Sequence, residues 1–306
     1  MSYEEDRREL LAPDLMARVS QIQIRTRRLV NDVLAGAYRS SFRGSGIEFD
    51  EVRPYQPGDD VRSIDWNRTA HTGETFIKTY IEERELTLMF LVDSSRSMDF
   101  GSAEFTKREI AAQFTALLAF VAQRQQDRVG LCLFGQEPGL HLPPRKGASC
   151  VARVVREVLA APADEAGSDF EAVLELQARA LRRHTLVFLI SDFHGGLPEG
   201  SQTLMRVARK HEVVAVRISD PFEEQLPAAG RIALRDLESG ARVELDTRSE
   251  GVRAAWETLA RERRESLEQQ LNREQIEIVD LSTERSVAEP VVRLFNRRRG
   301  RRAGPA

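Results

Sequence analysis

The sequence predicts an α/β fold, with a Rossmann-like open sheet that is mostly parallel and has helices on both faces. One reason is that, from residue 85 onward, short apolar runs alternate with longer segments of helical periodicity, which is the pattern of successive βαβ units. A second reason is that runs such as 86–92 are almost continuously apolar. Strands that are covered on both faces have this character, whereas half-solvated strands alternate apolar with polar residues.

The first 84 residues are expected to form an accessory segment, an N-terminal helix and a β-rich part, ahead of this sheet. Apolar residues recur at roughly helical spacing over residues 14–35, which predicts an amphipathic helix that ends near Gly36. A glycine-rich turn at 44–46 follows. Two strands are then predicted at 47–55 and 75–82, with a polar stretch that contains a Pro-Gly turn between them.

Strands and helices alternate through the rest of the chain. The strands are expected at 86–92, 128–134, 185–191, 212–218 and 275–281. The helices are expected at about 104–124, 148–160, 169–182, 200–210, 250–271 and 286–297. A turn is expected at 143–147, and residues 232–236 and 242–246 predict a hairpin. We therefore divide the chain into an accessory segment (1–84), an α/β domain (85–298) and a basic flexible tail (299–306).

The composition is that of an ordinary soluble globular protein. The 306 residues are 41% hydrophobic and 30% charged, and the formal net charge of -3 gives no overall attraction to nucleic acid or acidic membranes. The two cysteines do not form a C-x-x-C pair, so no disulfide framework is expected. The acidic N-terminus does not resemble a signal peptide, and no apolar stretch reaches the roughly 20 residues that cross a bilayer. We expect a cytoplasmic protein without a transmembrane segment.

Polar side chains follow two predicted strands at their carboxyl ends, where ligands bind in open parallel sheets. The first strand runs into a D-x-S-x-S loop formed by Asp93, Ser95 and Ser97, and a later strand runs into Asp192. Ser168 opens the helix before that later strand. Carboxylates and hydroxyls are hard oxygen donors, which suit Mg²⁺ or Mn²⁺. Asp93 and Ser97 could instead only cap the next helix, but the other polar side chains at the same edge favour a metal site.

These residues resemble the metal-ion-dependent adhesion site of von Willebrand factor A domains, which combines such a loop with a later hydroxyl and a strand-end aspartate. In addition, residues 48–55 and the string Y-x-P-G-D-D-x-R-x-I-D-W at 55–66 resemble the bacterial family called domain of unknown function 58. Its members place this segment ahead of an A-type domain, and the resemblance spans about residues 20–295.

The resemblance implies that the metal-site residues, with Mg²⁺ or Mn²⁺ as the metal, are Asp93, Ser95, Ser97, Ser168 and Asp192. The family usually has threonine where this chain has Ser168. A hydroxyl is retained there, but the neighbouring Asp169 is an alternative ligand. The resemblance therefore leaves two alternatives for this ligand, Ser168 and Asp169.

The resemblance also implies a metal-dependent protein-interaction module rather than an enzyme. A carboxylate from the partner would complete the coordination shell of the metal. Because family members commonly accompany AAA+ ATPases of the MoxR group, the expected partner is such an ATPase or its client protein. The expected role is that of an adaptor in assembly, maturation or the insertion of metals or cofactors. The chain has no G-x-x-x-x-G-K-S/T phosphate loop, so any ATP-driven work falls to another chain.

Two other functions are open at this stage. A strand-end aspartate with Mg²⁺ could serve a phosphoesterase, although Ser95 stands where a haloacid-dehalogenase-like phosphatase has its second aspartate. A nucleic-acid-binding function would use the basic C-terminus. That patch consists of Arg293, Arg297, Arg298, Arg299, Arg301 and Arg302.

The string at 55–66 and His194 also have two interpretations each. For the string we favour an ion-pair network that docks the accessory segment to the main domain, with Trp66 as its anchor, over a surface for a partner. The network would consist of Arg53, Asp60, Arg62 and Asp65. For His194 we favour a surface loop over a position near the metal.

Overall fold

The computed structural model describes residues 17, 20–22, 37–38, 41, 47–82, 85–164, 167–198, 200–237 and 240–302. The chain divides into two compact units, one of residues 42–86 and one of all other residues. Most of the predicted helix at 14–35 and the whole glycine-rich turn at 44–46 lie outside the described residues. The described positions 17 and 20–22 are helical.

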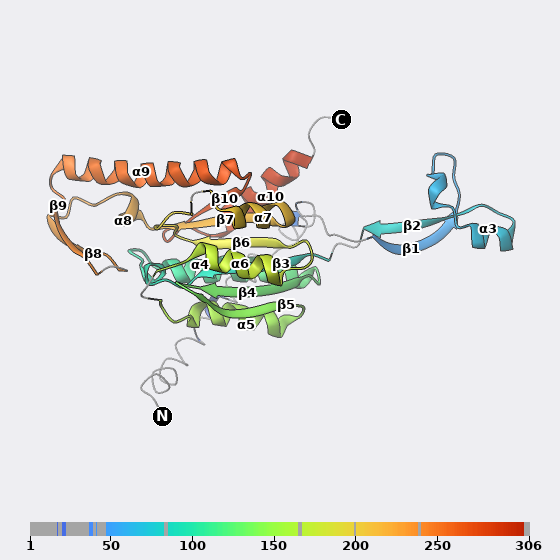
Figure 1. Cartoon of the computed structure of the whole chain (residues 1–306), viewed down its shortest axis with the longest axis horizontal. Coiled ribbons are helices and arrows are strands. Elements are labelled where there is room, and N and C mark those ends of the chain that lie inside the picture. Colours follow the sequence, from blue (N-terminus) through green and yellow to red (C-terminus); the bar gives the residue numbers. More distant parts are fainter. Residues whose placement is uncertain are drawn as a thin grey trace, which may run out of the picture. The chain divides into compact units, whose positions relative to one another are not determined.

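The main unit is built on a six-stranded sheet in the order β10-β7-β6-β3-β4-β5 (Figure 1). Its strands are β3 (Thr87–Asp93), β4 (Arg128–Phe134), β5 (Pro138–Arg145), β6 (Leu186–Ser191), β7 (Glu212–Ser219) and β10 (Glu277–Ser282). All neighbours pair in parallel except β4 and β5, which are antiparallel. The predicted open, mostly parallel sheet is therefore confirmed.

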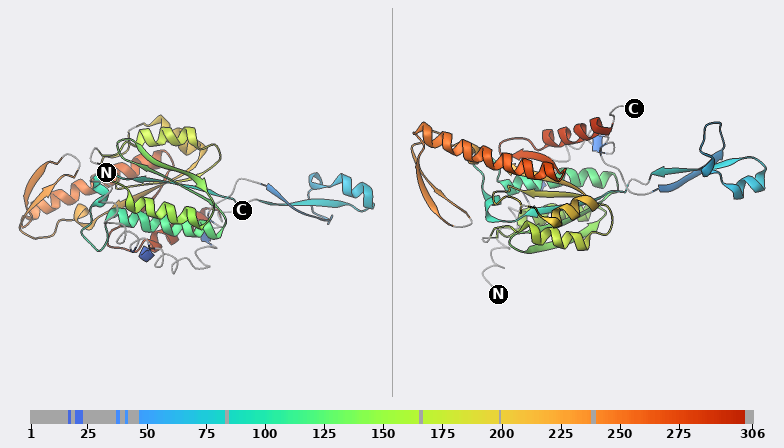
Figure 2. Two further views of the ribbon diagram at one scale, coloured as in Figure 1. Left: turned by 90° about the horizontal axis from the view of Figure 1, so that it is seen from below. Right: turned by 45° about the horizontal axis from the view of Figure 1, so that its top comes forward.

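Helices cover both faces of this sheet (Figure 2, left). They are α4 (Lys107–Arg124), α5 (Ala148–Ala160), α6 (Phe170–Ala180), α7 (Gln202–Lys210), α9 (Glu250–Arg273) and α10 (Ala288–Arg302). Successive side chains of β3 point to opposite faces, and both sets are buried. Met89 and Leu91 join a core with α6, α7 and α9, whereas Phe90 stacks on Phe188, which also contacts Phe114 of α4.

Near the sheet's carboxyl edge, a short helix and a hairpin follow β7. They are α8 (Pro221–Glu224), β8 (Arg231–Arg235) and β9 (Arg242–Asp246). The two strands pair only with each other, in antiparallel fashion. The predicted hairpin is therefore present.

Two parts of the main unit differ from the sequence-based prediction. Residues 138–145 form the edge strand β5, where only a turn at 143–147 was predicted. The prolines obscured it, but proline is tolerated in edge strands because no second neighbour needs its missing N–H. Residues 299–302, predicted to lie in a flexible tail, continue helix α10, and 303–306 lie outside the described residues.

The boundary of the accessory segment also differs from the predicted one. The hydroxyl of Tyr38 donates to Asp127 at 2.8 Å, and its ring packs edge-on against Phe295. Ser41 Oγ donates to the carbonyl of Phe295 at 2.9 Å. Because these residues pack on the main unit, the division falls at 41/42 and 86/87 instead of at 84/85 alone.

The small unit contains two antiparallel strands, β1 (Ile47–Pro54) and β2 (Phe76–Glu82), joined by a segment that holds η1 (Val61–Ser63) and α3 (Trp66–Thr72). Both strands were predicted, but the two short helices were not. Asp60 accepts from the Arg62 amide, and Asp65 accepts from two amides at the start of α3. Arg53 pairs with Asp59 through two hydrogen bonds, of 2.7 and 2.8 Å.

The predicted ion-pair network of the 55–66 string is therefore wrong in its details. Asp60 and Asp65 cap local turns of the small unit, because their oxygens lie next to unsatisfied backbone amides. The aspartate of the string that pairs with Arg53 is Asp59. Trp66 is 70% exposed, so it does not anchor the core of its own unit.

Within the part of the chain that the structure describes, no helix is both long enough and apolar enough to cross a membrane.

Candidate metal centre

Four of the five predicted site residues meet at the carboxyl edge of the sheet. Asp93 ends β3, and Asp192 directly follows the neighbouring strand β6. Ser95 Oγ lies 3.0 Å from Ser97 Oγ, and Ser97 also hydrogen-bonds the Asp192 carboxylate. Asp93 and Asp192 are close enough for their charges to repel each other.

Neutral donors hold the Asp93 carboxylate in place. Its Oδ1 accepts from the Ser95 amide at 2.8 Å, and its Oδ2 accepts from Ser191 Oγ at 2.6 Å. The next long helix, α4, is capped by Thr106 and Glu109 in a capping box. The alternative that Asp93 and Ser97 only cap that helix is therefore not observed.

Ser168 is not joined to this cluster. It is half-buried and, among the described residues, forms no hydrogen bond to Asp93, Ser95, Ser97 or Asp192. Asp169 caps helix α6, since its Oδ1 accepts from the amides of Glu171 and Ala172 at 2.8 and 3.1 Å.

The loop before α6 reaches the D-x-S-x-S loop through Asp164, which the sequence analysis missed. The Asp164 amide donates to the Ser94 carbonyl, and the Arg96 amide donates to the Asp164 carbonyl, each at 2.9 Å. These are backbone contacts, which no side-chain motif could have revealed.

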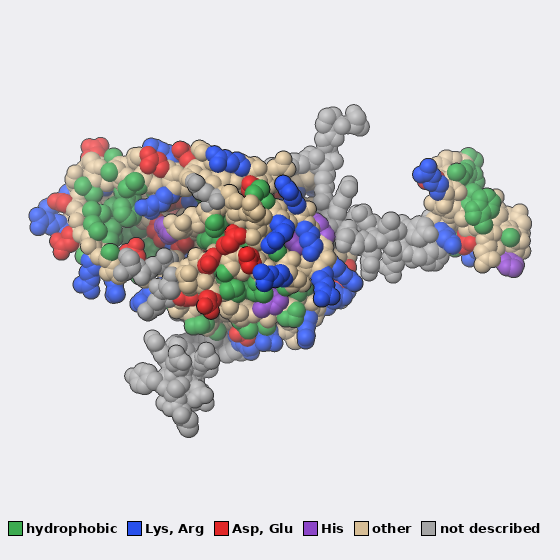
Figure 3. Space-filling view, viewed as in Figure 1, with side chains coloured by type: hydrophobic (Ala, Val, Ile, Leu, Met, Phe, Trp, Pro, Cys, Tyr) green, Lys and Arg blue, Asp and Glu red, His purple; other side chains and the backbone are tan. Residues whose placement is uncertain are grey.

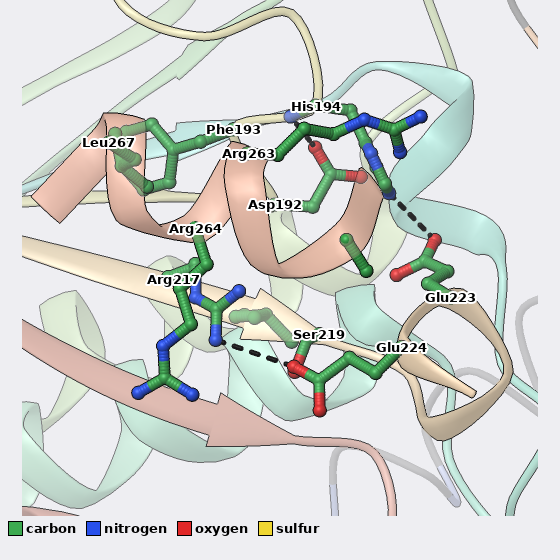
Figure 4. A pocket seen from close by; sticks show the side chains of 12 residues that line it. Asp192, Phe193, His194, Arg217, Ser219, Glu223, Glu224, Arg263, Arg264 and Leu267 are labelled. Carbon is green, nitrogen blue, oxygen red and sulfur yellow. Dashed lines mark hydrogen bonds and ion pairs between the residues drawn. The ribbon is translucent and has the colours of Figure 1, made fainter. Parts of the chain in front are cut away.

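A fully buried lysine lies beside Asp192. The ammonium of Lys107, at the start of α4, is 2.6 Å from Asp192 Oδ2 and 2.6 Å from Glu223 Oε1. His194 Nε2 lies 3.0 Å from the same Glu223 oxygen (Figure 4). His194 is an exposed loop residue, as we favoured from the sequence, and it also lies near the site. Lys107 and Glu223 carried no motif and were not predicted.

Asp192, His194 and Glu223 form a second group with the spacing of metal ligands. Their ligand atoms lie within 4.8 Å of one another. The Lys107 ammonium, however, already contacts both carboxylates. A cation is therefore supplied here by the protein itself, and the Asp93 side of the cluster is the better candidate for a metal.

The two aspartates titrate in opposite directions. Burial, followed by the charge of Asp192, raises the pKa of Asp93, against the effect of its hydrogen bonds from Ser191 and Ser95. Burial also opposes ionisation of Asp192, but the charges of Lys107 and His194 outweigh it and lower the pKa of that carboxyl. Asp93 is thus the carboxylate that lacks positive charge.

An open pocket of about 450 Å³ adjoins this cluster. Asp192 and His194 line one side, and Arg217, Arg263 and Arg264 come from β7 and α9 (Figure 4). Glu223 and Glu224 also line this pocket, so a ligand that reached Asp192 through it would meet charges of both signs.

Much of the C-terminal arginine patch is engaged in ion pairs. Arg298 pairs with Glu277 at 2.7 Å and with Glu212. Arg293 pairs with Glu289, and Arg297 donates to the carbonyl of Ile278. Arg297 and Arg298 fix helix α10 to the sheet, whereas Arg293 pairs within the helix. Together these contacts reduce the positive charge available to a nucleic acid.

An open α/β sheet with a D-x-S-x-S loop at its carboxyl edge defines a von Willebrand factor A-like protein, the class expected from the sequence. The chain belongs to the family described as "Protein of unknown function DUF58", whose family model matches residues 51–266. The family recognised from the 48–66 segment is therefore confirmed.

Known proteins similar to this chain include the uncharacterized protein Rv1480 of Mycobacterium tuberculosis. It is 33% identical over 230 residues, which is 74% of this chain and 72% of that protein. Among solved structures, an aerotolerance-related membrane protein from Bacteroides fragilis is 16% identical, with a TM-score of 0.47 over 71% of this chain and 99% of that one. The SpRpn10 VWA domain is 12% identical, with a TM-score of 0.39 over 68% and 94%.

Proposed function

We propose that this protein is a divalent-metal-dependent protein-interaction module. Its metal, Mg²⁺ or Mn²⁺, would be held by Asp93, Ser95, Ser97 and Asp192. The observation that supports this most is the state of Asp93, which is only 1% exposed and has no cation within ion-pair distance among the described residues. Burying an unpaired carboxylate costs several kcal/mol, and a divalent cation would supply the missing charge.

The donor set suits such a metal. Asp93 offers a carboxylate, and the Ser95 and Ser97 hydroxyls lie 3.0 Å apart beside it. Hard oxygen ligands of this kind favour Mg²⁺ or Mn²⁺ over softer metals. With so few protein ligands, a bound metal would keep coordination positions open, and there it would act as a Lewis acid that accepts a carboxylate from a partner protein.

Lys107 would give Asp192 a different role from that of Asp93. One oxygen of Asp192 accepts from Lys107 and the other from the His194 amide. The carboxylate also hydrogen-bonds Ser97. We infer that Asp192 orients the Ser97 hydroxyl toward the metal, which makes Asp93 the principal charged ligand.

The partner that we propose is a MoxR-type AAA+ ATPase or the client of such an ATPase. Family membership supports this, and so does the missing phosphate loop in the sequence, which makes a separate ATPase necessary for ATP-driven work. The role proposed is that of an adaptor in assembly, maturation or metal or cofactor insertion. No catalytic step is required of this chain.

The metal is tested by thermal unfolding of the full chain with Mg²⁺, with Mn²⁺ and with EDTA. We expect the metals to raise the Tm of the wild type and to leave Asp93→Asn unchanged. Asp220→Asn is the matched control, since Asp220 is also buried at a strand end but is satisfied by Ser102 and Thr283. Equal Tm values in metal and EDTA for the wild type would remove the metal from the proposal.

The partner is tested by affinity capture from the native lysate, run in parallel with Mg²⁺ and with EDTA. Recovery of an AAA+ ATPase by the wild type with Mg²⁺, but not by Asp93→Asn, is the expected result. Metal-dependent turnover of p-nitrophenyl phosphate that disappears in Asp93→Ala would instead assign the site to a hydrolase.

A further inference from the structure

The β8–β9 hairpin presents an apolar face that nothing in the described structure covers completely. Ile232 is paired with Leu245, and Leu234 with Val243, so the four side chains share one face. None of them is buried, and Val243 is 54% exposed. A two-stranded hairpin is only marginally stable alone in water, so such a face is expected to pack against something.

Exposed apolar side chains also lie on α8 and α9, the helices before and after the hairpin in the chain. Phe222 of α8 is 46% exposed and Leu259 of α9 is 50% exposed. Hydrophobic side chains gather around a hollow over this part of the molecule, at the left of the view in Figure 3. We call this surface, formed by Phe222, Val243, Leu259 and their neighbours, the hairpin hollow.

Hydrogen bonds hold the walls of the hairpin hollow together. Arg253 of α9 donates to the carbonyls of Thr247 and Arg248, at the end of the hairpin, at 2.7 and 3.0 Å. The Trp256 indole donates to the carbonyls of Phe222 and Glu223 at 3.2 and 3.0 Å. The hollow is therefore a preformed surface, which lowers the entropic cost of binding.

Helix α8 joins the hairpin hollow to the ion-pair network around Asp192. Phe222 faces solvent there, while the next residue, Glu223, contacts Lys107 and His194. A partner that covered Phe222 would therefore lie one residue away from the buried network around Asp192.

Helix α9 makes a second connection, and it carries charge. Leu259 and Arg263 are four residues apart, so they lie on one face of the helix about 6 Å apart along its axis. Arg263 lines the pocket beside Asp192 (Figure 4). It forms no ion pair with any described residue, whereas Arg261 and Arg264 on the same helix pair with Glu265 and Glu268.

We propose that the hairpin hollow and Arg263 together bind an acidic amphipathic segment of the protein partner. A large apolar side chain of that segment enters the hollow, and a carboxylate pairs with Arg263. Since two extended residues span about 6–7 Å, the apolar and acidic residues of the segment lie two or three positions apart. Where the segment also reaches the metal, this inference rests on the proposed function.

The test uses a phage-displayed random peptide library, panned on the full chain in Mg²⁺. One half of the bound phage is eluted with EDTA and the other half with acid. We expect enrichment of sequences that carry Asp or Glu two or three positions from Leu, Ile, Phe or Trp. An enriched peptide is then synthesised, and its affinity is measured by fluorescence polarisation.

Leu259→Glu and Arg263→Glu are each expected to weaken this peptide at least about tenfold, as anchor residues of an interface do. Val292→Glu, which changes an exposed apolar residue of α10, is the matched control and should bind as the wild type does. All three positions are exposed, so the fold should be retained, and far-ultraviolet circular dichroism checks this.

The outcomes separate this inference from the proposed function. Acidic peptides that need Mg²⁺ but bind Leu259→Glu normally would overturn the hairpin hollow and leave the metal site standing. Peptides that lose affinity in Leu259→Glu and Arg263→Glu but bind equally in EDTA would support the hollow and show that the segment does not reach the metal, whose own test is the comparison of Tm in Mg²⁺ and in EDTA. A wild-type dimer that Leu259→Glu converts to a monomer would assign the hollow to a second copy of this chain and overturn the inference. No enrichment of the expected pattern counts against it as well.

Discussion

Asp93 and Asp192 end neighbouring strands of one sheet, yet their charges are satisfied in different ways. Asp192 lies 2.6 Å from the ammonium of Lys107, and its pKa is lowered. Among the described residues, Asp93 accepts hydrogen bonds from neutral donors of Ser95 and Ser191, and its pKa is raised by burial and by the charge of Asp192. The difference teaches that, among the described residues, the protein supplies a cation to one carboxylate and none to the other, and the proposed metal would fill that place.

The largest effect is expected from Lys107→Met, which removes the internal cation. Asp192 and Glu223 would be left buried without it, and breaking such a pair costs about 3–5 kcal/mol. Urea denaturation should show the loss. Arg108→Met is the matched control, because its partner Asp99 is largely exposed and can be solvated. A loss of equal size in both variants would mean that the Lys107 network has no special weight.

Asp93→Asn should have the opposite effect in EDTA. It removes an unpaired buried charge, so the metal-free protein should become more stable, by about 1 kcal/mol, as happens when a strained functional residue is replaced. It should also lose the stabilisation by Mg²⁺, which in the wild type would reach ~2.7 kcal/mol at a hundredfold excess over Kd. Destabilisation of this variant in EDTA would show that Asp93 is structural.

The two aspartates should also give opposite pH dependences of the unfolding free energy in EDTA. The folded-state pKa of Asp93 is raised, so its contribution favours folding at low pH and is lost as pH rises from the unfolded value, about 3.9, through the folded one. The folded-state pKa of Asp192 is lowered, so its contribution is present above the unfolded value and is lost as pH falls through the folded one.

Urea titrations of the wild type, Asp93→Asn and Asp192→Asn across this range measure these slopes by difference. Mg²⁺ should abolish the slope that belongs to Asp93, because the metal holds the ionised form. The same sign for both aspartates would refute the assignment of Lys107 to Asp192 alone.

The smallest effects are expected at the serines. Ser97→Ala removes a proposed metal ligand that also bonds Ser95 and Asp192, and should weaken Mg²⁺ binding by at least about tenfold. Ser168→Ala should weaken Mg²⁺ binding less than Ser97→Ala does, because Ser168 forms no hydrogen bond to the described cluster. Isothermal titration with Mg²⁺ measures both. If the order is reversed, Ser168 is a ligand after all.

The sequence was informative wherever local pattern decides the structure. The parallel strands could be predicted from their nearly continuous apolar runs. Asp93 and Asp192 could be placed at one edge of the sheet because both directly follow such runs. Strand β5 was missed because its prolines fit a turn as well as an edge strand. Helix α3 was missed because its polar residues fit a loop as well as a short helix.

The cation beside Asp192, Lys107, could not be predicted from a local sequence pattern. Lys107 meets its partners across 85 and 116 residues of sequence, through the packing of α4 against the sheet. A single lysine near a helix N-terminus has no pattern that distinguishes a buried position from a solvated one, since lysine is almost never buried. The asymmetry between the two aspartates therefore became visible only in three dimensions.

The prolines of β5 have a consequence for how the protein behaves at high concentration. Three of the eight residues of this edge strand are proline, and they have no amide to offer to a further strand. At the opposite edge, β10 carries Glu277 and Asp280, whose charges are tied to Arg298 and Arg217. Both ends of the sheet are thus poor templates for edge-to-edge pairing, the usual first step of β-aggregation.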